Sequence, residues 1–146
     1  MLSKSDKEQL RSVIFRHLDG IATATTTTTL YKKGVLTYLL EHKKVELSEL
    51  TRAFNANEGY LNVALRILAS QGWLIQHLDN KTNKVSYEVN EKSKKAFELA
   101  YLYKDAVDLL SYSVIFPEER IGPDAFSVLE RIFRKHEAKY DLIDVS

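Results

Sequence analysis

The residue types that ligate metals or carry out nucleophilic chemistry are sparse in this 146-residue chain, and their spacing forms no site. The chain has no cysteine, which removes thiolate ligands, disulfides and cysteine nucleophiles together and fits a reducing compartment. The four histidines are His17, His42, His77 and His136. No two of them have the i, i+3 or i, i+4 spacing that brings two imidazoles to one helix face. We therefore expect surface histidines and no metal ligands.

Glycine spacing and acid placement likewise give no catalytic pattern. No two glycines form a Gly-x-Gly pair, so the chain has no phosphate or dinucleotide loop. Glu46, Glu49 and the pair Glu118–Glu119 have no neighbouring base or apolar pocket, which favours a solvated face over general acid–base catalysis. We expect no catalytic and no cofactor-binding residue here. Whether the chain is the N-terminal part of an enzyme stays open.

The stretch most able to recognise a partner is a helix predicted from residue 57 to 72. Asn57 can cap it, because its side-chain oxygen can accept a hydrogen bond from a free N–H of the first turn. Its apolar residues recur at i, i+3, i+4 and i+7, the spacing of a buried stripe, and are Leu61, Ala64, Leu65 and Leu68. Gly72 suits the left-handed position that follows a helix.

The segments around this helix predict a winged helix-turn-helix. Residues 30–42 and 48–54 predict two preceding helices, with Phe54 filling the angle between the second and third helices. Residues 73–75 and the alternating Val85, Tyr87 and Val89 predict a hairpin, closed by the polar turn 79–83. Val45 predicts a short additional strand. The expected fold class is mainly α, with a two- or three-stranded antiparallel wing.

Helical extensions flank this unit. Residues 5–18 predict a first helix ended by Gly20, and the threonine-rich run 22–29 predicts an extended linker, because β-branching restricts χ1. A tolerated repeat without function is the alternative. A long helix is expected from about residue 90 to Pro117, and a last helix from Asp124. The predicted divisions are an N-terminal helix and linker (1–29), a winged-helix domain (30–90) and a helical extension toward an absent domain (91–146).

Composition places the chain in the ordinary globular class. Of its residues, 45% are hydrophobic and 28% are charged. The net charge is only +1, so the charge balance indicates neither a nucleic-acid partner nor a membrane partner. No apolar run is long enough to span a bilayer, and the charged N-terminus has no signal-peptide core. We expect a cytoplasmic protein.

Charge balance also weighs against DNA reading. From residue 57 to 90 the charged residues are Glu58, Arg66, Asp79, Lys81, Lys84 and Glu88, three of each sign. Affinity for DNA comes largely from neutralising phosphates, and a balanced helix and wing gain little from it. If the unit did bind DNA as a transcriptional regulator, the contacting residues would be Tyr60, Asn62, Arg66, Lys81 and Lys84.

Three runs in the chain carry a resemblance to a known family: 34–40, 46–51 and 57–74. Together they resemble the N-terminal winged-helix domain of class I S-adenosylmethionine-dependent methyltransferases, as in natural-product O-methyltransferases and polyketide-synthase methyltransferase modules. The resemblance implies a unit that dimerises and helps roof an active site without reading DNA. The family's Rossmann-like domain, which holds S-adenosylmethionine, has no counterpart in this chain, so no cofactor or catalytic residue is carried over. The chain would be an excised N-terminal domain, which the apolar tail 140–145 favours, or a free-standing relative.

The expected function is therefore a non-catalytic accessory and dimerisation domain of a methyltransferase in polyketide-type biosynthesis. The expected partners are a second copy or the chain's own methyltransferase domain, with no nucleic acid and no membrane. The predicted long helix carries apolar residues on more than one face, and we expect a dimer interface at Phe97, Leu102 and Leu109. Packing of the first and last helices on that long helix is the alternative.

Overall fold

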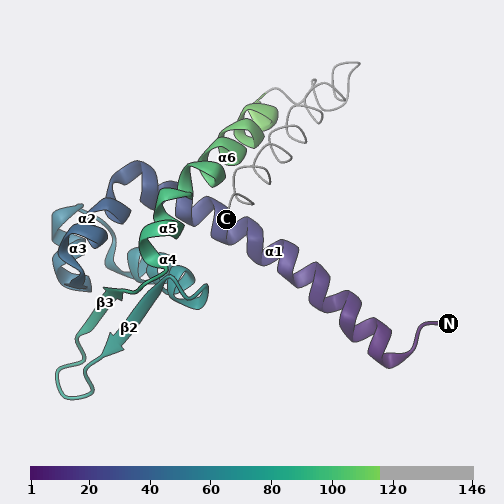
Figure 1. The fold of residues 1–146 in the computed structure, drawn as a ribbon, viewed down its shortest axis with the longest axis horizontal. Helices are drawn as coiled ribbons and strands as arrows, with labels where there is room; N and C mark the ends of the chain where they lie inside the picture. Colours follow the sequence, from purple (N-terminus) through teal and green to yellow (C-terminus); the bar gives the residue numbers. More distant parts are fainter. Residues whose placement is uncertain (116–146) are drawn as a thin grey trace.

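A computed structural model describes residues 1–115, with side chains to Asp108 (Figure 1). The described elements are α1 (Lys4–Lys33), α2 (Val35–His42), β1 (Lys44–Glu46), α3 (Leu47–Ala53), α4 (Glu58–Ser70), β2 (Leu74–Leu78), β3 (Val85–Val89), α5 (Ser93–Glu98) and α6 (Ala100–Ile115). The fold is mainly helical with one small sheet, and α2 to β3 follow the order of a winged helix-turn-helix. The predicted fold class is confirmed.

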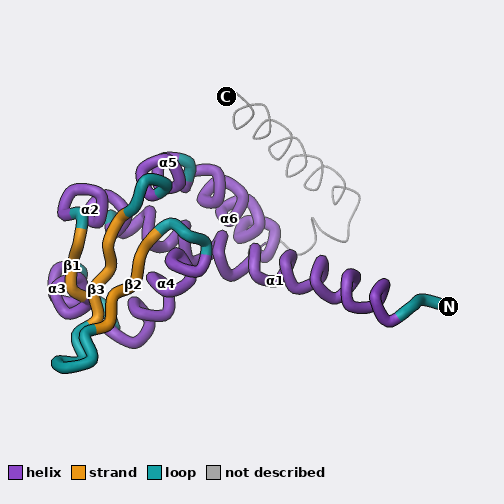
Figure 2. Tube along the Cα trace, turned by 60° about the horizontal axis from the view of Figure 1, so that its bottom comes forward, coloured by secondary structure: helices purple, strands orange, loops and turns teal. Residues whose placement is uncertain are grey.

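The sheet has three antiparallel strands in the order β1-β3-β2. β3 is central: Tyr87 pairs with Val45 on one side and with Gln76 on the other. The predicted short strand at Val45 is thus present. Side chains alternate across a strand, so Val45 and Tyr87, both fully buried, lie on the face that meets the helices. Figure 2 shows the sheet on one side of the helical layer.

Helix α4 begins and ends as its sequence predicts. The Asn57 side chain accepts a hydrogen bond from the backbone N–H of Tyr60. At the other end Gly72 has φ +83°, its N–H donates to the carbonyl of Ala69, and the N–H of Trp73 donates to the carbonyl of Leu68. This pair of bonds is a Schellman motif, which satisfies carbonyls that the helix leaves free.

The core lies between α1, α2, α3, α4 and the inner face of the sheet. Its fully or almost fully buried members include Leu36, Leu39, Val45, Leu47, Leu50, Leu61, Leu65, Leu68, Leu74, Tyr87 and Phe97. Phe54 packs against this core, but its ring meets Tyr38 of α2 edge-on at 5.3 Å. Phe54 therefore contacts the first helix of the winged unit.

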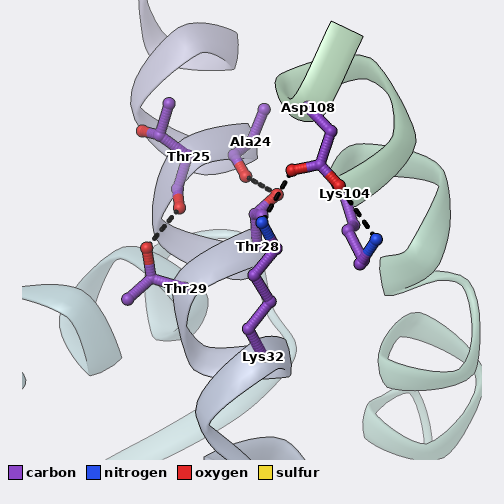
Figure 3. A network of polar contacts seen from close by, with 7 residues as sticks. All are labelled: Ala24, Thr25, Thr28, Thr29, Lys32, Lys104 and Asp108. Atoms are coloured by element: carbon purple, nitrogen blue, oxygen red, sulfur yellow. Dashed lines mark hydrogen bonds and ion pairs between the residues drawn. The ribbon is translucent and has the colours of Figure 1, made fainter. Parts of the chain in front are cut away.

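The threonine-rich run is helical, and the predicted linker is wrong. α1 continues through it for 30 residues, from the capping box of Ser3 and Asp6 to Lys33. Thr28 and Thr29 donate their hydroxyls to the carbonyls of Ala24 and Thr25, four residues earlier (Figure 3). These bonds satisfy the hydroxyls within the helix. Tertiary burial of Thr23, Thr27, Thr28 and Leu30 overrides the weak helix propensity of β-branched residues.

The predicted helix 30–42 is divided at Gly34. Residues 30–33 belong to α1, and Gly34 has φ +85°, which ends α1 and directs the chain into α2. A left-handed residue cannot continue a right-handed helix, and glycine adopts that conformation without a steric cost. Gly20, predicted to end the first helix, lies inside α1 instead.

The predicted long helix from residue 90 is also divided. α5 begins at Ser93, whose hydroxyl accepts from the N–H of Asn90 and donates to the carbonyl of Trp73. A break at Leu99 separates α5 from α6, which packs against α1. The predicted stop at Pro117, the helix from Asp124 and the tail 140–146 lie outside the described residues.

Candidate interaction surfaces

The junction between α4 and the wing is held by polar side chains. The Tyr87 hydroxyl, buried under the wing, donates to the Asn62 side-chain oxygen at 2.5 Å and accepts from the Gln76 amide at 3.1 Å. Burial raises the pKa of Tyr87, with the Gln76 amide and the Arg66 charge acting in the opposite direction. Asn62, predicted to read bases under the DNA interpretation, is engaged in holding the wing to the helix.

The outward face of α4 combines two exposed apolar side chains with few charges. Tyr60 is 80% exposed and Val63 is 55% exposed, and Ile67 is half-buried one turn after Val63. Arg66 is the one cation on α4, and Glu58 in its first turn is the one acid. Of the predicted DNA-contacting residues on this helix, Tyr60 and Arg66 are exposed and Asn62 is not free.

The wing tip carries paired charges. The backbone N–H of Lys81 donates to the Asp79 carboxylate, and this bond, first among several, lowers the pKa of Asp79. Lys84 Nζ lies 3.9 Å from Glu46 Oε1. His77 Nε2 lies 2.9 Å from Glu88 Oε1, across β2 and β3. A shallow groove beside the wing is lined by residues of both signs: Lys44, Glu46, Glu49, His77, Leu78, Asp79, Lys84 and Ser86. The surface of the wing is therefore mixed rather than basic.

Two of the three predicted dimer residues are buried in the described chain. Phe97 is 4% exposed and belongs to the core, and Leu102 is 8% exposed. Both side chains are thus buried within the single chain described, and their placement at a dimer interface stays a prediction. The side chain of Leu109 lies outside the described residues.

A polar clamp holds α6 on α1. The Asp108 carboxylate accepts from Lys32 of α1 at 2.6 Å and from Lys104 of α6 at 2.8 Å (Figure 3). These hydrogen bonds, that of Lys104 first, lower the pKa of Asp108. All three side chains stay more than one-third exposed, so the clamp orients the two helices more than it stabilises them.

The N-terminal part of α1, residues 4–21, projects away from the other described elements (Figures 1 and 2). We call it the arm. Its large apolar residues are 48% to 63% exposed and are Leu10, Ile14, Phe15, Leu18 and Ile21. The sequence identified the stripe of Leu10, Val13, Ile14 and Leu18, but the continuity of α1 that leaves this stripe bare was missed. Chain order alone did not reveal it, because the threonine run was interpreted as a break.

Neither a metal site nor a membrane helix is present in the described part of the chain. No three His, Cys, Asp or Glu residues gather in an arrangement that could hold a metal ion there. Among residues 1–115, no helix has the length and hydrophobicity needed to cross a membrane. His42 is exposed and stacks on the Tyr38 ring at 3.8 Å.

Comparison with known proteins finds one family model that matches part of the sequence. The sequence model of the family described as "AprA N-terminal domain" matches residues 10–76, which run from the arm through α4 into β2. The match covers somewhat less than half of the chain. A comparison with curated proteins finds no match.

Several solved structures resemble the chain at low identity. A MepR-like protein complexed with pseudoligands is 16% identical, with a TM-score of 0.45 over 94% of this chain and 95% of that one. A MarR-family transcriptional regulator from Silicibacter pomeroyi is 14% identical, with a TM-score of 0.43 over 100% and 98%. A mutant MarR from E. coli, complexed with operator DNA, is 15% identical, with a TM-score of 0.41 over 91% and 98%. Likeness at this level carries no argument about function.

Proposed function

We propose that this chain is a non-catalytic winged-helix accessory and dimerisation domain of an S-adenosylmethionine-dependent methyltransferase in polyketide-type biosynthesis. The outward face of α4 carries the proposal: it presents Tyr60 and Val63, while Asn62 is bonded to Tyr87. Such a face suits contact with protein better than contact with phosphate. The match to a family described as an N-terminal domain supports an accessory role beside further domains.

A winged-helix DNA-binding regulator is the second candidate. The exposed positions of Arg66, Lys81 and Lys84 favour it, since these side chains lie on the helix and wing that such proteins use. The neighbouring acids Glu58 and Asp79 weigh against it, because each places negative charge where phosphates would approach.

Selection from random duplex DNA at moderate salt tests the choice between the two. We expect no enriched motif. One enriched motif bound at nanomolar affinity, and lost on Arg66→Ala, would replace the accessory role with the regulator. Arg52→Ala, on the exposed surface of α3, is the matched control.

The link to a methyltransferase is tested separately. We expect the reading frame, or a gene beside it, to encode a Gly-rich strand-turn-helix of the kind that binds S-adenosylmethionine. We also expect this chain alone to give no heat on titration with S-adenosylmethionine. A genome in which no such sequence accompanies the chain would contradict the link while leaving the fold untouched.

A further inference from the structure

The arm of α1 is an uncovered apolar helix. Leu10, Ile14 and Leu18 recur at intervals of four residues, and Ile21 follows on the same side, so the four form one stripe. Helices in proteins owe most of their stability to packing of such a stripe, and this one has no cover among the described residues.

The part of the stripe formed by Leu10, Ile14 and Leu18 is self-complementary. In an antiparallel pair with a two-fold axis at Ile14, Leu10 of one copy lies opposite Leu18 of the other, and Ile14 meets its own counterpart. Two-fold pairing buries the same patch twice, which is the commonest way that a chain covers an apolar face with itself.

The charges of the arm select the antiparallel orientation. Its first half carries Lys4, Asp6, Lys7, Glu8 and Arg11, three cations against two acids, and residues 17–25 carry Asp19 as their one formal charge. A parallel pair would set each of these cations against its own copy. An antiparallel pair sets this half, with a net charge of +1, against the half that carries only Asp19, which removes the contacts of each charge with its own copy.

We propose that two copies of this chain dimerise by antiparallel pairing of their α1 arms about Ile14. This deepens the proposed function, of which dimerisation is a part, and names the surface that performs it. The dimer leaves α4 free, because the arms project away from the winged unit (Figure 1).

The size of the arm sets the strength of the association. Its 18 residues extend about 27 Å at about 1.5 Å per residue. One face of a single helix of that length is smaller than the roughly 800 Å² per partner of a standard stable interface. We therefore expect a reversible dimer with a dissociation constant in the micromolar range.

Sedimentation of the full chain at roughly 1 to 200 µM measures this association around its expected strength. We expect a mass rising from 16.8 kDa toward twice that value. Ile14→Glu should weaken the dimer by about 100-fold or more, since two carboxylates would meet on the axis. Ser12→Glu adds the same charge on the opposite side of the arm and should leave the dimer intact. Circular dichroism confirms that both variants fold.

Cross-linking tests the orientation, because the chain has no native cysteine. Helix axes that pack lie about 8–10 Å apart, within reach of a short bis-maleimide. A mixture of Leu10→Cys and Leu18→Cys chains should cross-link to each other, and each alone should cross-link poorly. Self-cross-linking of Leu10→Cys alone would overturn the antiparallel register. A monomer at every concentration would overturn this proposal. The DNA selection described above tests the choice between accessory domain and regulator independently of that result.

Discussion

The hydroxyl of Tyr87 donates to the side-chain oxygen of Asn62, and this bond joins the central strand of the wing to the middle of α4. The two residues are 25 positions apart in sequence. Their contact fixes the angle between the exposed helix and the hairpin, which are the two elements that a winged unit presents to a partner.

Removal of this hydroxyl should loosen the wing. Tyr87→Phe leaves the Asn62 oxygen and the Gln76 amide without their partner, and we expect the free energy of unfolding to fall by about 1 kcal/mol. Urea denaturation followed by circular dichroism measures it. Tyr60→Phe removes a hydroxyl from an exposed ring and should change little. Equal losses in the two variants would mean that the bond to Asn62 contributes nothing.

The two glycines Gly72 and Gly20 should respond oppositely to a side chain. Gly72 has φ +83° and open space around it, so Gly72→Val should cost at least about 1 kcal/mol through backbone strain alone. Gly20→Ala, within α1 and equally open, should stabilise by roughly 0.5 to 1 kcal/mol.

Trp73 beside Gly72 reports the melting. It is half-buried against the core, and its ring lies 6.3 Å from that of Tyr103, so a blue-shifted native emission is expected. A Gly72→Val chain that melts like the parent would contradict the helix end described here.

Thr27 and Thr28 form a matched pair of buried threonines. The Thr27 hydroxyl is buried without a hydrogen-bond partner among the described residues, whereas Thr28 donates to the Ala24 carbonyl at 2.7 Å. Thr27→Val removes an unsatisfied polar group and should stabilise by about 1 kcal/mol; Thr28→Val removes a bond made within the helix and should not. Thermal melts of both variants test this expectation. A Thr28→Val chain more stable than the parent would contradict the view that the Thr28 hydroxyl is the satisfied one.

The Asp108 clamp should make the stability sensitive to acid. The pKa of Asp108 is lowered in the folded chain, chiefly by the hydrogen bond from Lys104 and then by that from Lys32. Its contribution is therefore present above the unfolded carboxyl pKa of about 3.9 and is lost as the pH falls through the lower folded value.

Asp108→Asn should lower the urea midpoint slightly at pH 7, by less than Tyr87→Phe does, and the difference should vanish in strong acid. Asp105→Asn, on the same helix but in no ion pair with a described residue, is the control. A pH-independent loss would show that the Asp108 carboxylate acts through packing instead.

Local signals in the sequence were sufficient for the winged unit. The cap at Asn57, the stripe from Leu61 to Leu68, the left-handed Gly72 and the alternation around Tyr87 each specify a conformation through neighbours within a few residues. The structure has all four, and with them the face that α4 presents.

The extensions depend on contacts that are distant in sequence, and there the prediction failed. Five consecutive threonines from Thr25 to Thr29 have poor helix propensity, yet packing against α4 and α6 makes them helical. The same error hid the arm, since a linker there would have let the first helix fold back. Burial of Phe97 in the core and of Leu102 on α6, the helix that packs against α1, depends on such distant contacts and could not be read from periodicity.

An unbroken α1 also fixes the direction and the rotation of its N-terminal tip relative to the winged unit. Its 30 residues form a rod of about 45 Å, so the tip at Ser3 and the winged unit at Gly34 are separated by a constant length and a constant angle. One residue inserted into the arm would turn everything before it by about 100° and advance it by about 1.5 Å. Seven inserted residues would nearly restore the angle. The number of residues in this helix would therefore set the orientation, relative to the winged unit, of any protein fused ahead of Ser3.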